Sequence, residues 1–164
     1  MAEQDPPTTP ELALREGDSA DSSALVDLIN EAYLVEATIV SGDRTDEVEI
    51  RDKLSGGRFV VAEKDGRIVG CVYFEVDPPT SYWGLLAVHL AEQGTGLGRQ
   101  LMRHAEDEAR RAGANEAAIL VINLRRNLRG WYRGLGYSET GTSPFESPER
   151  QIQPCHFVVM KKEL

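Results

Sequence analysis

The sequence passes from a strand into a helix through Leu86-Ala87-Val88-His89-Leu90-Ala91-Glu92-Gln93-Gly94-Thr95-Gly96-Leu97-Gly98-Arg99. Glycines lack a Cβ, so successive backbone N–H groups of such a loop can converge on one point. The N-terminus of the following helix adds the positive end of its dipole. The loop is therefore typical of an anion site, with phosphate or pyrophosphate as the natural ligand. The alternative is a tight turn that serves packing alone.

Spacing excludes two familiar phosphate loops. A dinucleotide loop needs Gly-x-Gly-x-x-Gly in the first βαβ unit, whereas here the third glycine would fall at Leu101 and about four strands come first. A triphosphate loop needs Gly-x-x-x-x-Gly-Lys-Ser/Thr, and no such lysine follows these glycines.

Upstream of the loop the sequence predicts two helices and four strands. We expect a strand over residues 12–15, a helix capped by Asp21 or Ser22, a polar helix over 46–54 that ends at Gly56-Gly57, and a strand over 82–88. The clearest local signal is a β-hairpin, because two β-rich runs, 58–63 and 68–76, flank a short turn that contains Asp-Gly. Pro78-Pro79 ends its second strand.

Downstream of the loop the pattern predicts two helices and three strands. A long helix over 96–112 ends at Gly113, and a buried strand over 117–122 follows it. A short helix over 124–135 then ends at Gly136. The last two strands, over 137–140 and 155–161, flank a loop at 143–154. The order β-α-α-β-β-β-α-β-α-β-β predicts an α/β fold with a mixed, mostly antiparallel twisted sheet flanked by helices. Residues 1–10 are expected to be a flexible leader and residues 11–164 a single domain.

Composition narrows the function classes. The 164 residues are 41% hydrophobic and 27% charged, which suits one folded domain. With 18 basic and 27 acidic residues the net charge is −9, which argues against a broad basic face for nucleic acid. This acidity serves either solubility or a cationic substrate.

Targeting signals and metal sites find no support in the sequence. No apolar run has the length of a membrane span, and the first residues lack the pattern of a signal peptide, so we expect a cytoplasmic protein. Cys71 and Cys155 are then reduced thiols, although a disulfide is left open. His89, His104 and His156 are scattered, and no Cys/His cluster has metal-ligand spacing, so no metal is expected.

Two motifs resemble the GNAT N-acetyltransferases, enzymes with the acyl-CoA N-acyltransferase fold. Gln93-Gly94-Thr95-Gly96-Leu97-Gly98 fits the family signature Gln/Arg-x-x-Gly-x-Gly/Ala, and Trp131-Tyr132-Arg133-Gly134-Leu135-Gly136-Tyr137 resembles its aromatic-Tyr-x-x-x-Gly-aromatic signature. The element order also matches, so the resemblance covers residues 12–164. The ending Pro154-Cys155-His156-Phe157 is similar to that of small bacterial members.

The resemblance implies acetyl-CoA as cosubstrate and assigns its binding residues. The backbone amides of Gly94, Thr95, Gly96, Leu97, Gly98 and Arg99 would hold the pyrophosphate, with Gln93 opening the turn. Leu86, Ala87 and Val88 would pair their backbone with the pantetheine arm. Tyr132 would be the general acid that protonates the leaving thiolate, a role that suits a phenol with a pKa of about 10.

One position departs from the family pattern. Many members carry a CoA-contacting Asn seven residues before this tyrosine, where this sequence has Arg125, and Asn127 follows two residues later as the candidate replacement. The basic cluster Arg125, Arg126, Arg129 and Arg133 reaches the CoA phosphates or simply forms a solvated helix face.

The predicted reaction is direct acetyl transfer to a primary amine of a small molecule or peptide, which must first lose a proton. The strand over 82–88 holds no Glu, so Glu75 at the end of its neighbour is the predicted base, with Asp77 behind it and His156 as an alternative.

Acceptor recognition is expected from the first two helices and residues 143–154, with Tyr33, Tyr73 and Tyr82 either lining the cleft or packing the core. The acidic balance favours a cationic acceptor, and a homodimer is left open. Two other hypotheses remain: an acetyl-CoA sensor without turnover, and a partner-binding domain without a CoA site.

Overall fold

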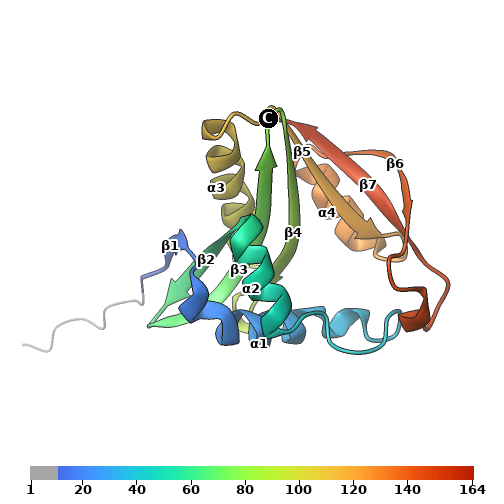
Figure 1. The fold of residues 1–164 in the computed structure, drawn as a ribbon, viewed down its shortest axis with the longest axis horizontal. Coiled ribbons are helices and arrows are strands. Elements are labelled where there is room, and N and C mark those ends of the chain that lie inside the picture. The colour runs from blue at the N-terminus through green and yellow to red at the C-terminus, as the bar shows by residue number, and fades with distance from the viewer. Residues whose placement is uncertain (1–10) are drawn as a thin grey trace, which may run out of the picture.

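A computed structural model describes residues 11–164 and shows a seven-stranded sheet with helices on both faces (Figure 1). The strand order is β1-β2-β3-β4-β5-β7-β6, and only the β4–β5 pair is parallel. The strands are β1 (Ala13–Glu16), β2 (Arg58–Lys64), β3 (Arg67–Asp77), β4 (Thr80–Val88), β5 (Glu116–Ile122), β6 (Ser138–Pro144) and β7 (His156–Glu163). The predicted element order and the mixed, mostly antiparallel sheet are confirmed. The expected leader, residues 1–10, lies outside the described residues.

Four α-helices and four short 3₁₀ helices complete the chain. The α-helices are α1 (Ser22–Ala32), α2 (Glu47–Gly56), α3 (Leu97–Arg111) and α4 (Arg126–Gly134) within residues 11–164. The 3₁₀ helices of the same part of the chain are η1 (Ser19–Asp21), η2 (Tyr33–Glu36), η3 (Leu90–Glu92) and η4 (Pro148–Arg150). The sequence pattern did not predict the 3₁₀ helices, since each is a single turn without hydrophobic periodicity.

One predicted cap is confirmed in position, and one predicted strand end is wrong. Asp21 is the N-cap residue of α1, but its side chain makes no capping bond to this helix, because its carboxylate accepts from the N–H of Asp18 and from Arg15. The strand predicted over 137–140 extends to Pro144, since β7 pairs with it along its whole length. Pro144 is tolerated there because β6 is an edge strand, where a missing N–H leaves no sheet partner unsatisfied.

Alternate residues of the central strands build two cores, one on each face of the sheet. Phe59, Val61, Cys71, Tyr73 and Leu85 face α1 and α2. Their neighbours in the strands, such as Val60, Val72 and Trp83, face α3 and join a second core that α4 also covers. This alternation follows from the period of two of a β-strand. The helices thereby fix both faces of β4, the strand that leads into the glycine loop.

The parallel pair β4–β5 separates partway along its length. Register partners run only from Thr80↔Glu116 to Trp83↔Ile119. Figure 1 shows the two strands adjacent near the top and diverging below. Leu85 follows with a φ of 50°, and the β3–β4 register shifts between Cys71 and Tyr73, so an irregularity bends β4 away from β5. The edges of both strands beyond this point are therefore available to a ligand.

No helix within residues 11–164 has both the length and the apolar composition to cross a membrane.

Candidate active site

The glycine loop presents free backbone donors at the start of α3. Gly94 and Gly96 have φ values of 78° and 86°, in the left-handed region that glycine adopts without strain. Among the described residues no backbone hydrogen bond is donated by Gly94, Thr95 or Gly96, and the first N–H to bond back to the loop is that of Gln100. A Cβ added at Gly94 or Gly96 would meet nothing within 4 Å. The loop thus forms an open cradle of N–H groups that fits a pyrophosphate.

The loop is held in place by contacts at both ends. Gln93 Nε2 donates to the carbonyl of Val88, 3.2 Å away, and closes the loop over the end of β4. Lys64 Nζ lies 2.9 Å from Glu92 Oε1 and ties η3 to β2. These contacts orient the donors before any ligand binds, which reduces the ordering cost of binding.

Gly98 connects the loop to α4. A Cβ at this position would lie 3.4 Å from the Trp131 ring, so a side chain here would press on α4. Trp131 packs edge-on against Tyr132 with ring centroids 5.0 Å apart, and Tyr132 packs likewise on Tyr137 at 5.7 Å. The start of α3 thus positions the aromatic residues of α4 directly.

Tyr132 is buried, with 7% of its surface exposed, and its ring lines a pocket. Burial raises the pKa of this phenol above its ordinary value. Within residues 11–164 no side chain bonds to its hydroxyl, so the proton is not committed elsewhere. A buried phenol that keeps its proton can donate it to a departing anion.

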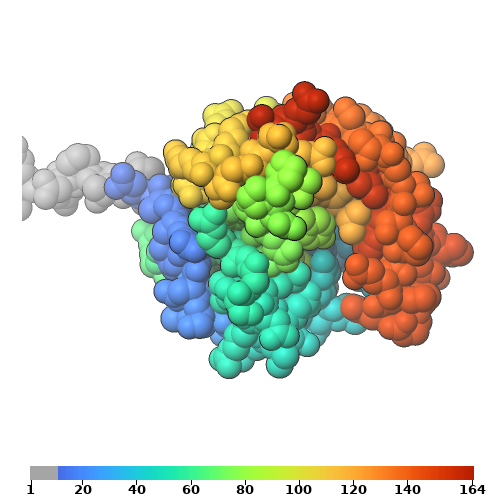
Figure 2. All heavy atoms as spheres, turned by 45° about the horizontal axis from the view of Figure 1, so that its top comes forward, coloured from blue at the N-terminus to red at the C-terminus, as the bar shows by residue number. Residues whose placement is uncertain are grey.

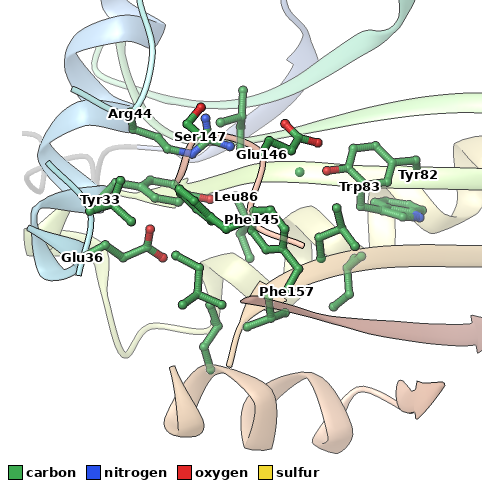
Figure 3. A pocket seen from close by; sticks show the side chains of 18 of the residues that line it. Tyr33, Glu36, Arg44, Tyr82, Trp83, Leu86, Phe145, Glu146, Ser147 and Phe157 are labelled. Atoms are coloured by element: carbon green, nitrogen blue, oxygen red, sulfur yellow. The ribbon is translucent and has the colours of Figure 1, made fainter. Parts of the chain in front are cut away.

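The pocket lies between the diverging strands and has a volume of about 310 Å³ (Figure 3). Its floor is formed by β4 and β5, from Tyr82 to Leu86 and from Ile119 to Ile122, and one side by Leu128 and Tyr132 of α4. The remaining walls come from two parts of the chain. One is the segment between α1 and α2 with the first turn of α2, which contributes Tyr33, Glu36, Val40, Arg44 and Glu49. The other is the β6–β7 connection and the start of β7, which contribute Phe145, Glu146, Ser147, Arg150 and Phe157. The two regions expected to recognise the acceptor therefore meet at one pocket that also holds Tyr132.

Charged side chains of both signs line this pocket, and most have protein partners. Glu36 Oε1 is 2.7 Å from Arg125 Nη1, and Arg150 donates to backbone carbonyls. Arg44 is only loosely paired, with Nη1 3.8 Å from Glu49 Oε1 and its guanidinium over the Tyr33 ring. Glu146 forms no ion pair among the described residues, and in Figure 3 its carboxylate lies near Tyr82. Arg44 and Glu146 are therefore the pocket charges most available to a ligand.

The charges of Arg44 and Glu146 both act on Tyr82. Burial raises the pKa of its phenol, the charge of Arg44 opposes the rise, and the charges of Glu146 and Glu75 add to it. Burial likewise raises the pKa of Tyr33 at the other end of the pocket. Both tyrosines stay neutral at physiological pH and serve as hydrogen-bonding walls.

Several residues singled out in the sequence lie outside the pocket wall. Glu75 is exposed near the end of β3, opposite Tyr82 in register, and accepts a 2.6 Å hydrogen bond from Tyr73, which is buried in the core. Asn127 is exposed on α4. His156 is exposed at the start of β7, beside a separate hollow that Arg126 and Arg129 share. None of the three polar residues Glu75, Asn127 and His156 lines the pocket that Tyr132 shares with β4 and β5.

Three of the four arginines in the basic cluster at α4 pair with carboxylates, and Arg126 forms no ion pair within residues 11–164. Arg125 pairs with Glu36, while Arg129 and Arg133 both bond to Glu139 Oε1 at 2.8 and 2.6 Å. Their contacts crosslink α4 to η2 and to β6. These ion pairs favour the structural reading of the basic cluster over the phosphate-binding one.

Sequence reasoning did not single out Glu36, Arg44, Glu146 or Arg150. Each lies in a connecting segment without periodicity, and each reaches the pocket only through contacts between distant parts of the chain. The one available signal was the prediction that these segments recognise the acceptor. Within residues 11–164 no group of His, Cys, Asp and Glu side chains has the arrangement of a metal site.

Comparison with known proteins places this geometry in a family. Residues 55–139, which include the glycine loop and Tyr132, match the family model of the acetyltransferase (GNAT) domain. The chain belongs to the GNAT acetyltransferase family. It is accordingly an N-acetyltransferase of this fold, as the two sequence motifs predicted.

Relatives of known name extend the likeness over most of the chain. The GNAT chain is 30% identical to the L-methionine sulfoximine/L-methionine sulfone acetyltransferase of Salmonella typhimurium, over 81% of this chain and 84% of that protein. It is 27% identical to the L-amino acid N-acyltransferase MnaT of Escherichia coli, over 81% and 83%. The solved structure of Salmonella typhimurium yncA with its cofactor acetyl-CoA superposes with a TM-score of 0.72 at 25% identity, covering 94% of both chains. GNAT relatives thus bind acetyl-CoA on this fold.

Proposed function

We propose that this chain transfers the acetyl group of acetyl-CoA directly to the primary amine of a small molecule that also carries an anionic group, with a free amino acid as the model acceptor. One observation carries the proposal: the open N–H cradle at Gly94–Arg99 follows β4 along the chain, and the uncommitted phenol of Tyr132 lines the pocket at which β4 separates from β5. The cradle lies outside the pocket wall, and the end of β4 from Leu86 to Val88 leads from the pocket toward it, so a cofactor held along this strand would reach both the proton donor and the acceptor space.

The residues present fit acetyl-CoA. The N–H groups of Gly94, Thr95, Gly96, Leu97, Gly98 and Arg99 would hold the pyrophosphate, and the unpaired edge of β4 at Leu86–Val88 would bond the pantetheine arm. When bound, acetyl-CoA supplies the acetyl group as a thioester. Asn127 stays a candidate CoA contact: it is exposed on α4 and, like the glycine loop, lies outside the pocket wall.

The acceptor proposal rests on the two available charges. Arg44 offers a guanidinium for a carboxylate, and Glu146 offers a carboxylate for an ammonium group. The names of two relatives, which act on L-methionine sulfone and on L-amino acids, agree with an acceptor of this kind. A purely cationic acceptor, as the net charge suggested, remains a prediction, but it would leave Arg44 without a role in binding.

Transfer then needs three proton movements. The ammonium of the acceptor gives a proton to a carboxylate, for which Glu146 is the candidate on the pocket wall. The neutral nitrogen forms the new C–N bond as the C–S bond breaks, and the phenol of Tyr132 protonates the departing sulfur. The nitrogen then loses its second proton, which restores the phenol. Burial raises the pKa of Tyr132, so the phenol holds its proton until the thiolate departs.

Thiol release at fixed acetyl-CoA, measured over a panel of amines, tests this function. We expect turnover with free L-amino acids and a KM at least about tenfold higher for the matching amines without a carboxylate, because the contact to Arg44 is lost. Tyr132→Phe should lower kcat about a hundredfold and leave CoA affinity unchanged, since only proton donation is removed.

The alternatives give different results in the same experiment. CoA binding without transfer to any amine would support an acetyl-CoA sensor. Absence of thermal stabilisation at millimolar CoA would support a partner-binding domain. Cytoplasmic location and a homodimer stay predictions.

A further inference from the structure

Two segments far apart in the sequence are joined across the pocket. We call residues 37–43, which follow η2, the strap, and residues 145–153, between β6 and β7, the β6–β7 loop. Val40 and Gln151 form an isolated antiparallel bridge, and the N–H of Ile152 donates to the carbonyl of Ile39 at 2.8 Å. In Figure 1 the strap and the loop meet at the lower right, and in Figure 2 the cyan and orange-red segments lie side by side.

Arg150 is the centre of this junction. Its Nε donates to the carbonyl of Ser41 at 2.8 Å, and its Nη2 donates to the carbonyl of Asp43 at 2.6 Å. The carbonyl of Arg150 accepts from the N–H of Ser41 at 2.8 Å. Gly42 lies between the two carbonyls with a φ of 81°, a conformation that allows both to point at one guanidinium. A guanidinium with several fixed donors is well suited to hold two carbonyls at once.

A second arginine fixes the beginning of the strap. Arg125, at the start of α4, pairs with Glu36 at the end of η2, and both side chains are largely buried. The strap is thus attached to α4 at one end and to the β6–β7 loop at the other. Backbone bonds to the β6–β7 loop and the buried side chain of Ile39 hold the middle of the strap, so loss of the Arg150 side chain would loosen mainly residues 41–43.

The junction is itself part of the pocket wall. Val40 and Arg150, which take part in the bonds between strap and loop, both line the pocket. The wall facing β4 and β5 is therefore continuous at this point. The volume of about 310 Å³ lies at the lower end of the range of about 300–1,000 Å³ for small-molecule sites, and the reacting end of acetyl-CoA must share it.

We infer that Arg150 is a positioning residue that closes the acceptor end of the pocket, and that this closure restricts the acceptor to free small amines and excludes the amino terminus of a polypeptide. The inference rests on the proposed function. A polypeptide acceptor needs an exit from the pocket for the rest of its chain, and the joined strap and loop close the wall at Val40 and Arg150. A free amino acid ends within the pocket and needs no such exit.

The test compares Arg150→Met with wild type, using a free amino acid and a tripeptide that begins with the same residue. Methionine keeps an apolar stem but has no donors, so the strap loses its hold. We expect wild type to prefer the amino acid, and the ratio of the two kcat/KM values to fall about tenfold or more in Arg150→Met. The KM for acetyl-CoA should stay unchanged, and amide exchange at residues 41–43 should accelerate.

Two further variants keep the test decisive. Arg51→Met removes an arginine of α2 that is 65% exposed and should leave the ratio unchanged. Gly42→Ala disturbs the junction without changing Arg150, since its Cβ would lie 3.4 Å from the guanidinium at a strained φ, and should shift the ratio in the same direction. It serves as the test if Arg150→Met does not fold.

The two possible failures can be told apart. Efficient use of the tripeptide by wild type, or an unchanged ratio in variants whose strap exchanges faster, overturns the inference and leaves the acetyltransferase function standing. Failure of wild type to acetylate any amine overturns the proposed function itself. The exchange rates of residues 41–43 report the role of Arg150 in holding the strap in either case.

Discussion

Two carboxylates compete for the role of general base, and their surroundings separate them. Glu75 comes from the strand beside β4, as sequence reasoning expected, but its carboxylate already accepts the hydroxyl proton of Tyr73 at 2.6 Å and lies off the pocket wall. Glu146 lines the pocket and forms no ion pair within the described residues. A base must reach the proton that it removes, so position favours Glu146.

We therefore expect Glu146→Gln to impair catalysis more than Glu75→Gln. Glutamine keeps the size and hydrogen bonding of the side chain but cannot take a proton, so kcat/KM for the amine should fall about a hundredfold in Glu146→Gln and less than about threefold in Glu75→Gln. Steady-state kinetics with saturating acetyl-CoA measure both. The reverse order would restore Glu75 as the base, and equal small losses would indicate a water-mediated route.

Local patterns were enough to predict some of these residues and not others. The glycine loop and Tyr132 follow from short motifs in which each position depends on its neighbours in the chain. The pairing of Glu36 with Arg125 joins residues 89 apart, and that of Arg150 with Ser41 joins residues 109 apart. No periodicity encodes such pairs, because they depend on how far the strands separate and where the loops then meet.

Among the secondary-structure elements, the neighbouring strand determined the strand ends that the sequence pattern did not predict. β6 has little intrinsic preference for a strand around Gly141, yet it extends to Pro144 because β7 offers a complete antiparallel edge. The hairpin between β2 and β3 is predictable from its own sequence. Asp65 and Gly66, with φ values of 54° and 72°, fit the tight turn that this Asp-Gly pair specifies. Elements with strong local signals and the edge strand β1 were predicted closely, whereas the end of β6 was not.

One arginine connects the four-residue edge strand β1 to η1 and to β2 through its side chain. Arg15 bonds both carboxylate oxygens of Asp21, at 2.8 and 2.9 Å, and Glu63 of β2 at 2.9 Å. The hydrogen bonds from Arg15 lower the pKa of Asp21 below its ordinary value. A lowered folded pKa stabilises the protein above the unfolded pKa of about 3.9, and this contribution is lost as the pH falls through the folded value.

Arg15→Met should accordingly lower the free energy of unfolding by about 1 kcal/mol at pH 7, a modest figure because water partly screens the arginine. The deficit relative to wild type should stay constant between about pH 5 and 7 and shrink below about pH 4, where Asp21 becomes protonated in both proteins. Urea denaturation across this pH range measures it. Arg51→Met, in an exposed pair with Glu47, should show almost no deficit. A deficit that persists unchanged to pH 2.5 would contradict the role of Asp21.

For the whole molecule, the net charge of −9 opposes the approach of an anionic cosubstrate. Three of the four arginines that would offset this field near α4 are already paired, Arg125 with Glu36, and Arg129 and Arg133 with Glu139. Binding of CoA then relies on backbone N–H groups at the glycine loop, which act only at short range. Long-range repulsion and short-range attraction respond differently to salt, because screening removes the first before the second.

The association rate of CoA should therefore rise as monovalent salt increases from about 20 to about 150 mM, over which the Debye length shortens to about 8 Å. Stopped-flow mixing measures this rate, and pantetheine, which lacks the phosphates, provides a control whose rate should not change. A basic cofactor channel would give the opposite slope, with association slowing in salt. That outcome would mean that arginines such as Arg126 and Arg99 dominate the electrostatic field near the cofactor site. The basic cluster at α4 would then bind the CoA phosphates, contrary to what its ion pairs favour.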